Sequence, residues 1–195
     1  MSVDPEIHWP IPPEGGWTAD DLDRLPNLPP HTELIDGSLV FVSPQTRFHL
    51  RAVRFFEYQL LSLAPEGFEV LREFTIDIDR RNRPEPDVIV VPDDDDEDLD
   101  QARLPAASVR LAVEVVSPES VERDREVKPL KYARAGIPHY WRVENDGGRA
   151  VVYVNELEPA TGVYVCTGIF RDRLKVSVPF PLDLDLTTVT ARRPE

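Results

Sequence analysis

Two carboxylates stand inside short β-branched stretches of this sequence, where hydrophobic side chains are expected. Asp87 opens the stretch D-V-I-V-V, and Glu114 interrupts the stretch L-A-V-E-V-V. Burying a charge among Val, Ile and Leu is costly unless another group pairs with it. If the two stretches are neighbouring strands of a parallel or mixed sheet, their carboxylates converge. Converging oxygen ligands suit a hard divalent cation such as Mg²⁺, so the sequence indicates a metal site with Asp87 and Glu114 as ligands.

Each of these residues also has an interpretation without chemistry. Asp87 follows Pro86 and could begin a strand from a turn, and Glu114 could face solvent on an edge strand. Lys128 lies four residues after Asp124, the spacing of an ordinary helical surface pair that contributes only about 0.2–0.5 kcal/mol. These alternatives stay open at the level of the residues alone.

Two further polar residues have roles that need no catalysis. His49 begins a segment with a buried face, and a capping or structural role is expected for it ahead of a catalytic one. Asp36 precedes Gly37, and this dipeptide is suited to a type I′ turn between the alternating apolar runs T-E-L-I and S-L-V-F-V. The segment therefore predicts a β-hairpin.

The elements that must position these residues follow from periodicity and from start and stop signals. Apolar residues at helical spacing predict an amphipathic helix over 45–64, and a second helix is expected over 122–135, ending near Gly136. Thr18 and Asp21 form a capping box that opens a short helix. Strands are predicted at about 69–78, 87–91, 110–116, 139–144, 150–155 and 163–168. This order predicts an α/β or α+β fold with a mixed sheet flanked by helices.

The chain divides into a Pro-rich N-terminal arm over 1–16 and one domain over 17–195. The tail carries Pro179, Pro181 and Pro194 and is expected to pack irregularly. The single cysteine, Cys166, excludes an intrachain disulfide. Without a signal peptide or a long apolar run, the chain is expected to be soluble and cytoplasmic.

The formal net charge of the 195-residue chain is −14, from 36 acidic and 22 basic residues. Seven of the eight positions over 93–100 are acidic, which is typical of a solvated, mobile loop. The acidic balance argues against strong nonspecific binding to nucleic acid, because such binding comes from Lys and Arg at phosphates. It leaves room for a local basic cleft.

A set of motifs in a fixed order resembles a known family. The motifs are E-L-I-D-G-S-L-V, P-D-V-I-V-V, E-V-V-S-P-E-S, D-R-E-V-K followed by Tyr132, and A-G-I-P-H-Y-W. Their combination is similar to the Uma-two family, whose members are described as restriction endonucleases of the PD-(D/E)XK nuclease superfamily. The resemblance covers about residues 17–155. It implies a restriction-endonuclease-like core with a metal site at one end of its sheet.

The resemblance also implies roles for individual residues. Asp87 matches the aspartate of the PD motif, and Glu114 matches the acidic residue of the second half-motif. The lysine expected two residues later is replaced by Val116, and the family pattern supplies a lysine from the following helix, here Lys128. Glu33 matches the upstream acidic residue of the site. The implied catalytic set is therefore Glu33, Asp87, Glu114 and Lys128.

One local feature complicates the assignment of the lysine. Pro129 follows Lys128 directly, and proline is tolerated only in the first turn of a helix. The helix is therefore expected to begin late or to kink, and Lys131 is the alternative lysine.

The chemistry that fits these residue types is hydrolysis of a phosphodiester bond. Mg²⁺, or Mn²⁺, would lower the pKa of a bound water and neutralise charge on the leaving oxygen. A lysine that is partly desolvated near the metal would have a lowered pKa and could also help to take the proton. The expected function is a Mg²⁺-dependent DNA endonuclease, with a homodimer as the simplest way to cut both strands. The alternatives are an inactive nuclease-like binding or assembly module and an enzyme that hydrolyses another phosphoester.

Overall fold

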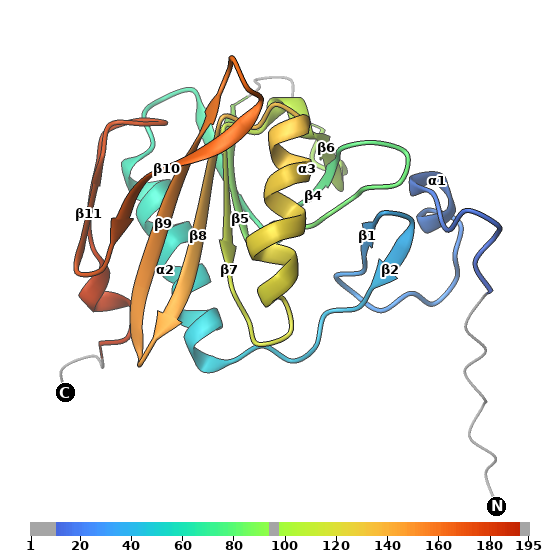
Figure 1. Ribbon diagram of the computed structural model, residues 1–195, viewed down its shortest axis with the longest axis horizontal. Coiled ribbons are helices and arrows are strands. Elements are labelled where there is room, and N and C mark those ends of the chain that lie inside the picture. Colours follow the sequence, from blue (N-terminus) through green and yellow to red (C-terminus); the bar gives the residue numbers. More distant parts are fainter. Residues whose placement is uncertain (1–10, 94–97, 192–195) are drawn as a thin grey trace, which may run out of the picture.

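The computed structural model describes residues 11–93 and 98–191, and its central element is a six-stranded mixed sheet (Figure 1). The spatial order of the strands is β10-β9-β8-β7-β5-β3. These strands are β3 (Phe68–Arg72), β5 (Val88–Pro92), β7 (Leu111–Val115), β8 (His139–Asp146), β9 (Arg149–Glu158) and β10 (Val163–Phe170). The mixed sheet with flanking helices confirms the fold class predicted from the sequence.

The strands that carry the two predicted metal ligands are neighbours in this sheet. β5 pairs with β7 in antiparallel orientation, and β7 pairs with β8 in parallel orientation. A parallel pair needs a crossover connection, which here contains the π-helical turn η2 (Arg123–Val127) and helix α3 (Lys128–Arg134). The crossover therefore brings Lys128 back over the sheet.

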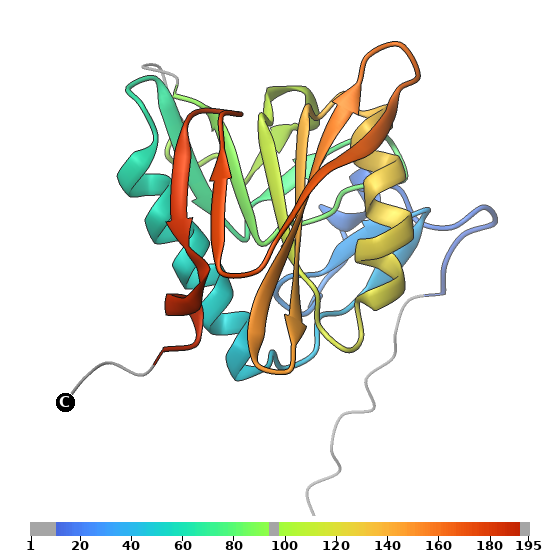
Figure 2. The same cartoon turned by 60° about the vertical axis from the view of Figure 1, so that its left-hand side comes forward.

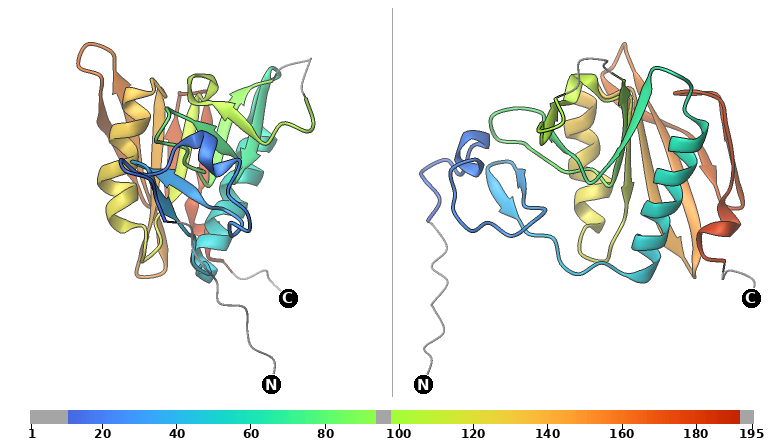
Figure 3. Two further views of the ribbon diagram at one scale, coloured as in Figure 1. Left: turned by 90° about the vertical axis from the view of Figure 1, so that its right-hand side faces the viewer. Right: turned by 180° about the vertical axis from the view of Figure 1, so that it is seen from behind.

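Each face of the sheet is covered by a separate layer, as Figures 2 and 3 show. Helix α2 (Arg47–Leu63) packs on one face together with β11 (Arg173–Val176), β12 (Leu182–Asp185) and the 3₁₀ turn η3 (Leu186–Val189). Helix α3 packs on the other face with β4 (Thr75–Asp77). Because side chains alternate along a strand, Val88 and Val90 of β5 face the α2 layer while Ile89 and Val91 face the α3 layer.

The N-terminal part forms a small hairpin beside α3. Helix α1 (Ala19–Leu22) begins at the predicted Thr18–Asp21 capping box, and β1 (Glu33–Ile35) pairs with β2 (Ser38–Val40). The connecting Asp36 and Gly37 have φ angles of +51° and +79°, as a type I′ turn requires.

An ion-pair network anchors this N-terminal part to the rest of the fold. Buried Arg83 binds Asp23 after α1 and Asp77 of β4, and Arg103 of β6 (Arg103–Pro105) binds the same two carboxylates. The network therefore joins three segments that are distant in sequence.

Two local predictions were wrong, and two short elements were not predicted. The strand expected over 69–78 is two strands, β3 and β4, because the backbone turns at Glu73, where φ is +49°. The short β6 and the 3₁₀ turn η1 (Ala106–Ser108) were not predicted. The tail is not irregular, since β11 and β12 form a hairpin whose Leu174, Leu182 and Leu184 are buried. Pro179 and Pro181 lie between these strands and so do not interrupt their pairing.

Parts of two sequence predictions lie outside the described residues. They concern 1–10 of the Pro-rich arm and 94–97 of the acidic run; Pro194 of the tail also lies outside them. Among the helices of the described residues, none has the length and apolar character needed to cross a membrane.

Candidate active site

A cavity of about 50 Å³ lies where β5 begins and β7 ends. Its lining brings together side chains from β7, the segment that leads into β5, the β1–β2 hairpin, α2 and the crossover. The titratable residues that line it are Glu33, His49, Glu85, Asp87, Glu114, Glu119, Arg123, Asp124 and Lys128. All four sequence-predicted site residues, Glu33, Asp87, Glu114 and Lys128, are in this list.

Asp87 and Glu114 are carried to the same place by strand pairing. Val88 is paired with Val113, so the next position in the antiparallel register sets Asp87 opposite Glu114. Opposed residues of an antiparallel pair project from the same face of a sheet. A hydrogen bond of 2.6 Å from the Val115 backbone N–H to Asp87 Oδ2 fixes this register at its end.

Lys128 lies at the centre of the carboxylates. Its Nζ is 3.0 Å from Glu114 Oε1 and 3.1 Å from Glu33 Oε1. Burial by itself would lower the pKa of Lys128, but the charges of Glu114 and Glu33 outweigh it and raise the pKa well above its usual value. This arrangement therefore favours the charged ammonium form of Lys128. The lowered pKa expected for a lysine beside a bound metal stays a prediction.

The π-helical turn resolves the conflict between Lys128 and Pro129. The N–H of Lys128 bonds to the carbonyl of Arg123, five residues earlier, and the α-helix begins only at Lys128. Pro129 thus occupies the first turn of α3, where proline is tolerated. The wide turn preserves the position of Lys128, and π-turns of this kind often occur at functional sites.

Tyr132 is the second buried donor to Glu114. It lies one helical turn after Lys128 and donates a 2.6 Å hydrogen bond to Glu114 Oε1, the oxygen that Lys128 also contacts. Burial, reinforced by the charge of Glu114, raises the pKa of Tyr132 well above its usual value, so the hydroxyl keeps its proton. Two donors spaced i,i+4 on α3 therefore orient one carboxylate.

Asp87 is also held by His49, which contacts the carboxylate oxygen that Val115 does not. His49 Nε2 lies 3.1 Å from Asp87 Oδ1, and His49 is only 5% exposed. Burial lowers the pKa of His49, but the hydrogen bond and charge of Asp87 raise it, with a net rise. The backbone N–H of His49 also donates to the hydroxyl of Thr46, the residue that caps the start of α2. The expected structural role for His49 is thus joined to direct contact with the predicted metal ligand.

Asp124 is a site residue that the sequence reasoning missed. The expected surface pair with Lys128 exists, with Nζ and Oδ1 3.6 Å apart, but Asp124 is only 1% exposed and lines the cavity. Burial raises the pKa of Asp124, while the charge of Lys128 opposes the rise. The signal available in the sequence was its place in the D-R-E-V-K motif, four residues before the lysine.

The hairpin contributes Glu33, and the alternative lysine lies elsewhere. Glu33 Oε1 also accepts a 2.9 Å hydrogen bond from the backbone N–H of Glu85, which fixes its orientation toward Lys128. Lys131 Nζ instead lies 2.5 Å from Asp36 Oδ1 at the hairpin turn. The structure therefore places Lys128, and not Lys131, among the carboxylates.

The donor set of the cavity fits a divalent cation through its chemistry. Glu33, Asp87, Glu114 and Asp124 are hard oxygen donors in excess over the ammonium of Lys128. Burial raises the pKa of Glu114 well above its usual value, and its neighbouring carboxylates add to the effect that Lys128 opposes. No group of three or more His, Cys, Asp or Glu in the described ranges is arranged to enclose a metal ion. Mg²⁺, which takes only one or two protein carboxylates and keeps several waters, remains compatible with Asp87 and Glu114.

Buried polar atoms without a hydrogen-bond partner concentrate around the same cavity. Six buried side-chain nitrogen or oxygen atoms of the described residues have no hydrogen-bond partner, and four of them belong to residues that line it. These four are Gln45 Oε1, His49 Nδ1, Arg123 Nε and Asp124 Oδ1. Because buried polar groups are normally paired, their clustering is typical of a binding site.

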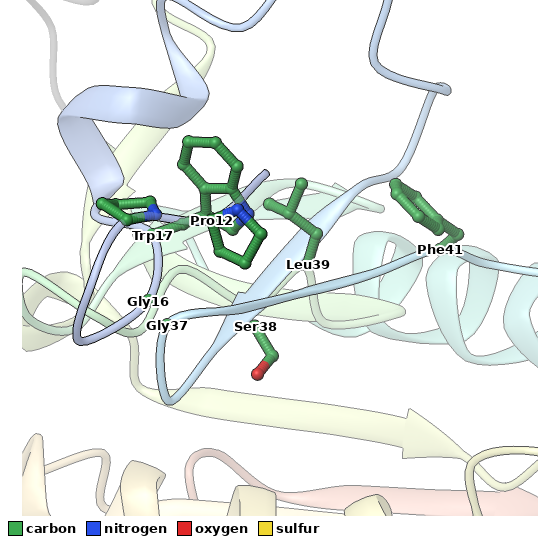
Figure 4. A pocket seen from close by; sticks show the side chains of 8 residues that line it. Pro12, Gly16, Trp17, Gly37, Ser38, Leu39 and Phe41 are labelled. Atoms are coloured by element: carbon green, nitrogen blue, oxygen red, sulfur yellow. The ribbon is translucent and has the colours of Figure 1, made fainter. Parts of the chain in front are cut away.

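A larger pocket of about 350 Å³ lies on the N-terminal side of the hairpin (Figure 4). It is lined by Pro12, Pro13, Gly16, Trp17, Gly37, Ser38, Leu39 and Phe41. None of these side chains is an acid or base that titrates in the physiological range. The pocket therefore does not compete with the carboxylate cavity as a catalytic centre.

Comparisons with known proteins identify a family and a solved structure with the same fold. The model of the family described as "Uma2: Putative restriction endonuclease" matches residues 19–189. The chain also resembles a solved structure from Anabaena variabilis ATCC 29413, described as "a putative nuclease belonging to DUF820". The TM-score is 0.67 at 16% identity, over 89% of this chain and 97% of that chain, which shows a shared fold. No curated protein matches the chain.

Proposed function

The chain belongs to the Uma2 family, described as "Putative restriction endonuclease", and we propose that it is a Mg²⁺- or Mn²⁺-dependent endonuclease that hydrolyses DNA phosphodiester bonds. The family and the nuclease described for the solved relative support nuclease chemistry. The metal, the DNA substrate and the roles of individual residues are our proposals.

The observation that carries the proposal is the buried carboxylate cluster around Lys128. Glu33, Glu114 and Asp124 are each less than 5% exposed, and Asp87 lines the same cavity. Six carboxylic side chains line the cavity against three basic ones, His49, Arg123 and Lys128, and unneutralised buried charge is costly. This excess of carboxylic over basic side chains supports a site that binds a further cation.

Within this site we assign Asp87 and Glu114 as the residues that hold the metal. A bound divalent cation would polarise the phosphate and lower the pKa of a water molecule. His49 and the backbone of Val115 orient Asp87, while Tyr132 and Lys128 orient Glu114. These contacts keep the carboxylates in place before substrate arrives, which removes a reorganisation cost from the reaction.

Lys128 and Glu33 then act as a pair. Lys128, whose Nζ contacts both Glu114 and Glu33, stabilises the negative charge that develops on the phosphate. Glu33 anchors the ammonium from the hairpin side.

The test is calorimetric titration of Mg²⁺ and Mn²⁺ into the wild type and Asp87→Ala, followed by cleavage of supercoiled plasmid. We expect the wild type to bind metal and nick the plasmid, and Asp87→Ala to do neither while keeping the wild-type circular dichroism spectrum. Asp172→Ala is the matched control, since Asp172 is exposed and lies outside the carboxylate cavity. A wild type that binds DNA but cleaves no DNA, RNA or simple phosphodiester would favour the inactive binding module.

For cleavage of both strands of a duplex, we propose that the protein acts as a homodimer. One site per chain reaches both strands most simply when two copies are related by symmetry. Light scattering at micromolar concentration tests this proposal, and a fully active monomer would contradict it.

A further inference from the structure

We infer that Arg123 binds the phosphate backbone of the nucleic acid at the mouth of the carboxylate cavity; this inference rests on the proposed nuclease function. A phosphate that approaches a cluster of carboxylates needs a positive group to meet it. Lys128 is held by Glu114 and Glu33 and is assigned to the charge that develops at the reacting phosphate, so holding the rest of the nucleic-acid backbone requires a further basic group.

Arg123 is the cation that meets this requirement. It lines the same cavity as Asp87, Glu114 and Lys128. Its Nε is buried without a hydrogen-bond partner, and within the described ranges its side chain forms no ion pair. An unpaired buried N–H costs free energy, so a ligand that accepts a hydrogen bond from it would gain more binding free energy than at an exposed N–H.

The other basic side chains of this segment are committed or distant. Arg125 forms two hydrogen bonds with Glu144, from Nε to Oε1 at 3.0 Å and from Nη2 to Oε2 at 2.5 Å. Lys131 is paired with Asp36. Arg134 is exposed at the C-terminal end of α3, away from the cavity. Arg123 is therefore the basic residue of this segment that both reaches the cavity and remains available.

The chemistry of the guanidinium favours a phosphate as its ligand. The planar fork of arginine matches two oxygens of a phosphate group, and such charge-assisted bonds are stronger than neutral ones. A contact to the backbone fixes the position of the duplex and carries no sequence information. Arg123 would thus place a phosphodiester above Asp87 and Glu114 regardless of base sequence.

The experiment compares Arg123→Ala and Arg123→Lys with Arg125→Ala and Arg134→Ala. All three alanine variants lose one positive charge, but only the first loses the cavity-lining guanidinium. Binding of a short fluorescein-labelled DNA duplex is followed by anisotropy in Ca²⁺ over about 50–200 mM salt, and cleavage of the same duplex is followed in Mg²⁺. Circular dichroism checks that each variant is folded.

We expect Arg123→Ala to raise the Kd by about 10- to 100-fold, as for loss of a hydrogen-bonded charged contact. The slope of log K against log salt should fall by about one, and KM should rise with the Kd. The Kd of Arg123→Lys should lie between those of the wild type and Arg123→Ala, because lysine keeps the positive charge but lacks the planar guanidinium. Arg125→Ala and Arg134→Ala should bind as the wild type does.

The outcomes separate this inference from the proposed function. Wild-type binding and cleavage by Arg123→Ala would overturn the role of Arg123 and leave the nuclease intact. A wild type that binds DNA through Arg123 without cleaving it would support the role of Arg123 and overturn the nuclease. A wild type that neither binds nor cleaves would overturn both. If Arg123→Ala only lowers the thermal stability, with Kd and salt slope unchanged, Arg123 is a structural residue and the inference fails.

Discussion

The hydroxyl of Tyr140 donates a 2.6 Å hydrogen bond to the backbone carbonyl of Asp124. In the π-turn, the N–H of Lys128 bonds to the carbonyl of Arg123, five residues back. The next bond of that series would run from residue 129 to Asp124, but Pro129 has no N–H. Tyr140 on β8 therefore satisfies the carbonyl that the proline leaves open, and ties the crossover that carries Asp124 and Lys128 to the sheet.

Tyr140→Phe should destabilise the protein and also reduce turnover. The unpaired carbonyl of Asp124 should cost about 1–3 kcal/mol, measurable by urea unfolding. Tyr164→Phe is the control, because Tyr164 donates a 2.7 Å bond to the carbonyl of Ile137, away from the cavity. The two variants should lose similar stability, but only Tyr140→Phe should lower kcat. Equal turnover by both variants would show that this bond does not position the site.

Lys128→Ala should lower turnover by about 10²-fold or more, the range of charge-stabilising and general acid–base groups. Metal affinity measured by calorimetry should not fall, since lysine is not a ligand. Lys128→Arg should restore little activity. The planar guanidinium cannot replace the compact point charge of an ammonium that contacts two buried carboxylates.

Lys131→Ala serves as the control for Lys128, since its ammonium is paired with Asp36 outside the cluster. Its turnover should match that of the wild type. Near-wild-type cleavage by Lys128→Ala would remove Lys128 from the proposed mechanism.

Glu114→Gln should abolish turnover and weaken Mg²⁺ binding without unfolding the protein. An amide oxygen still accepts from Tyr132 and Lys128, so the buried donors stay paired. The substitution also removes one negative charge from a cluster that has too many, so metal-free stability should stay equal or rise. A large loss of stability in urea unfolding would instead indicate that Glu114 is chiefly a structural partner of Lys128.

His139 should make the protein less stable as the pH falls. Burial lowers the pKa of His139, so the folded protein binds its proton less readily than the unfolded chain does. Stability from this residue is fully present above the unfolded pKa of about 6.5 and declines as the pH drops below it. Between pH 7.5 and pH 5 the free energy of unfolding should therefore fall more for the wild type than for His139→Gln, by denaturant titration. Parallel pH profiles for the two proteins would contradict this.

Much of the fold could be predicted from the sequence because the decisive signals are local. The β-branched run from Val88 to Val91, the capping box at Thr18 and the Asp36-Gly37 turn depend on neighbours a few residues away. The same locality indicated Asp87 and Glu114, since a charge in a β-branched stretch is visible without knowing the fold. The tail was mispredicted because its prolines were taken as a sign of irregular structure. Pro179 and Pro181 instead lie in the connection between the two strands of a hairpin.

The convergence of the site was decided by the tertiary structure. The i,i+4 spacing of Asp124 and Lys128 is identical whether the pair faces water or the interior, so the sequence could not distinguish a weak surface pair from a buried one. That choice depends on the π-turn and on the sheet against which it packs, and these involve contacts between residues far apart in the chain. The contact of His49 with Asp87 and the unpaired Nε of Arg123 likewise arise only when α2, β5 and the crossover meet at one end of the sheet. Residue types set the available chemistry, while burial and long-range pairing decided which residues take part in it.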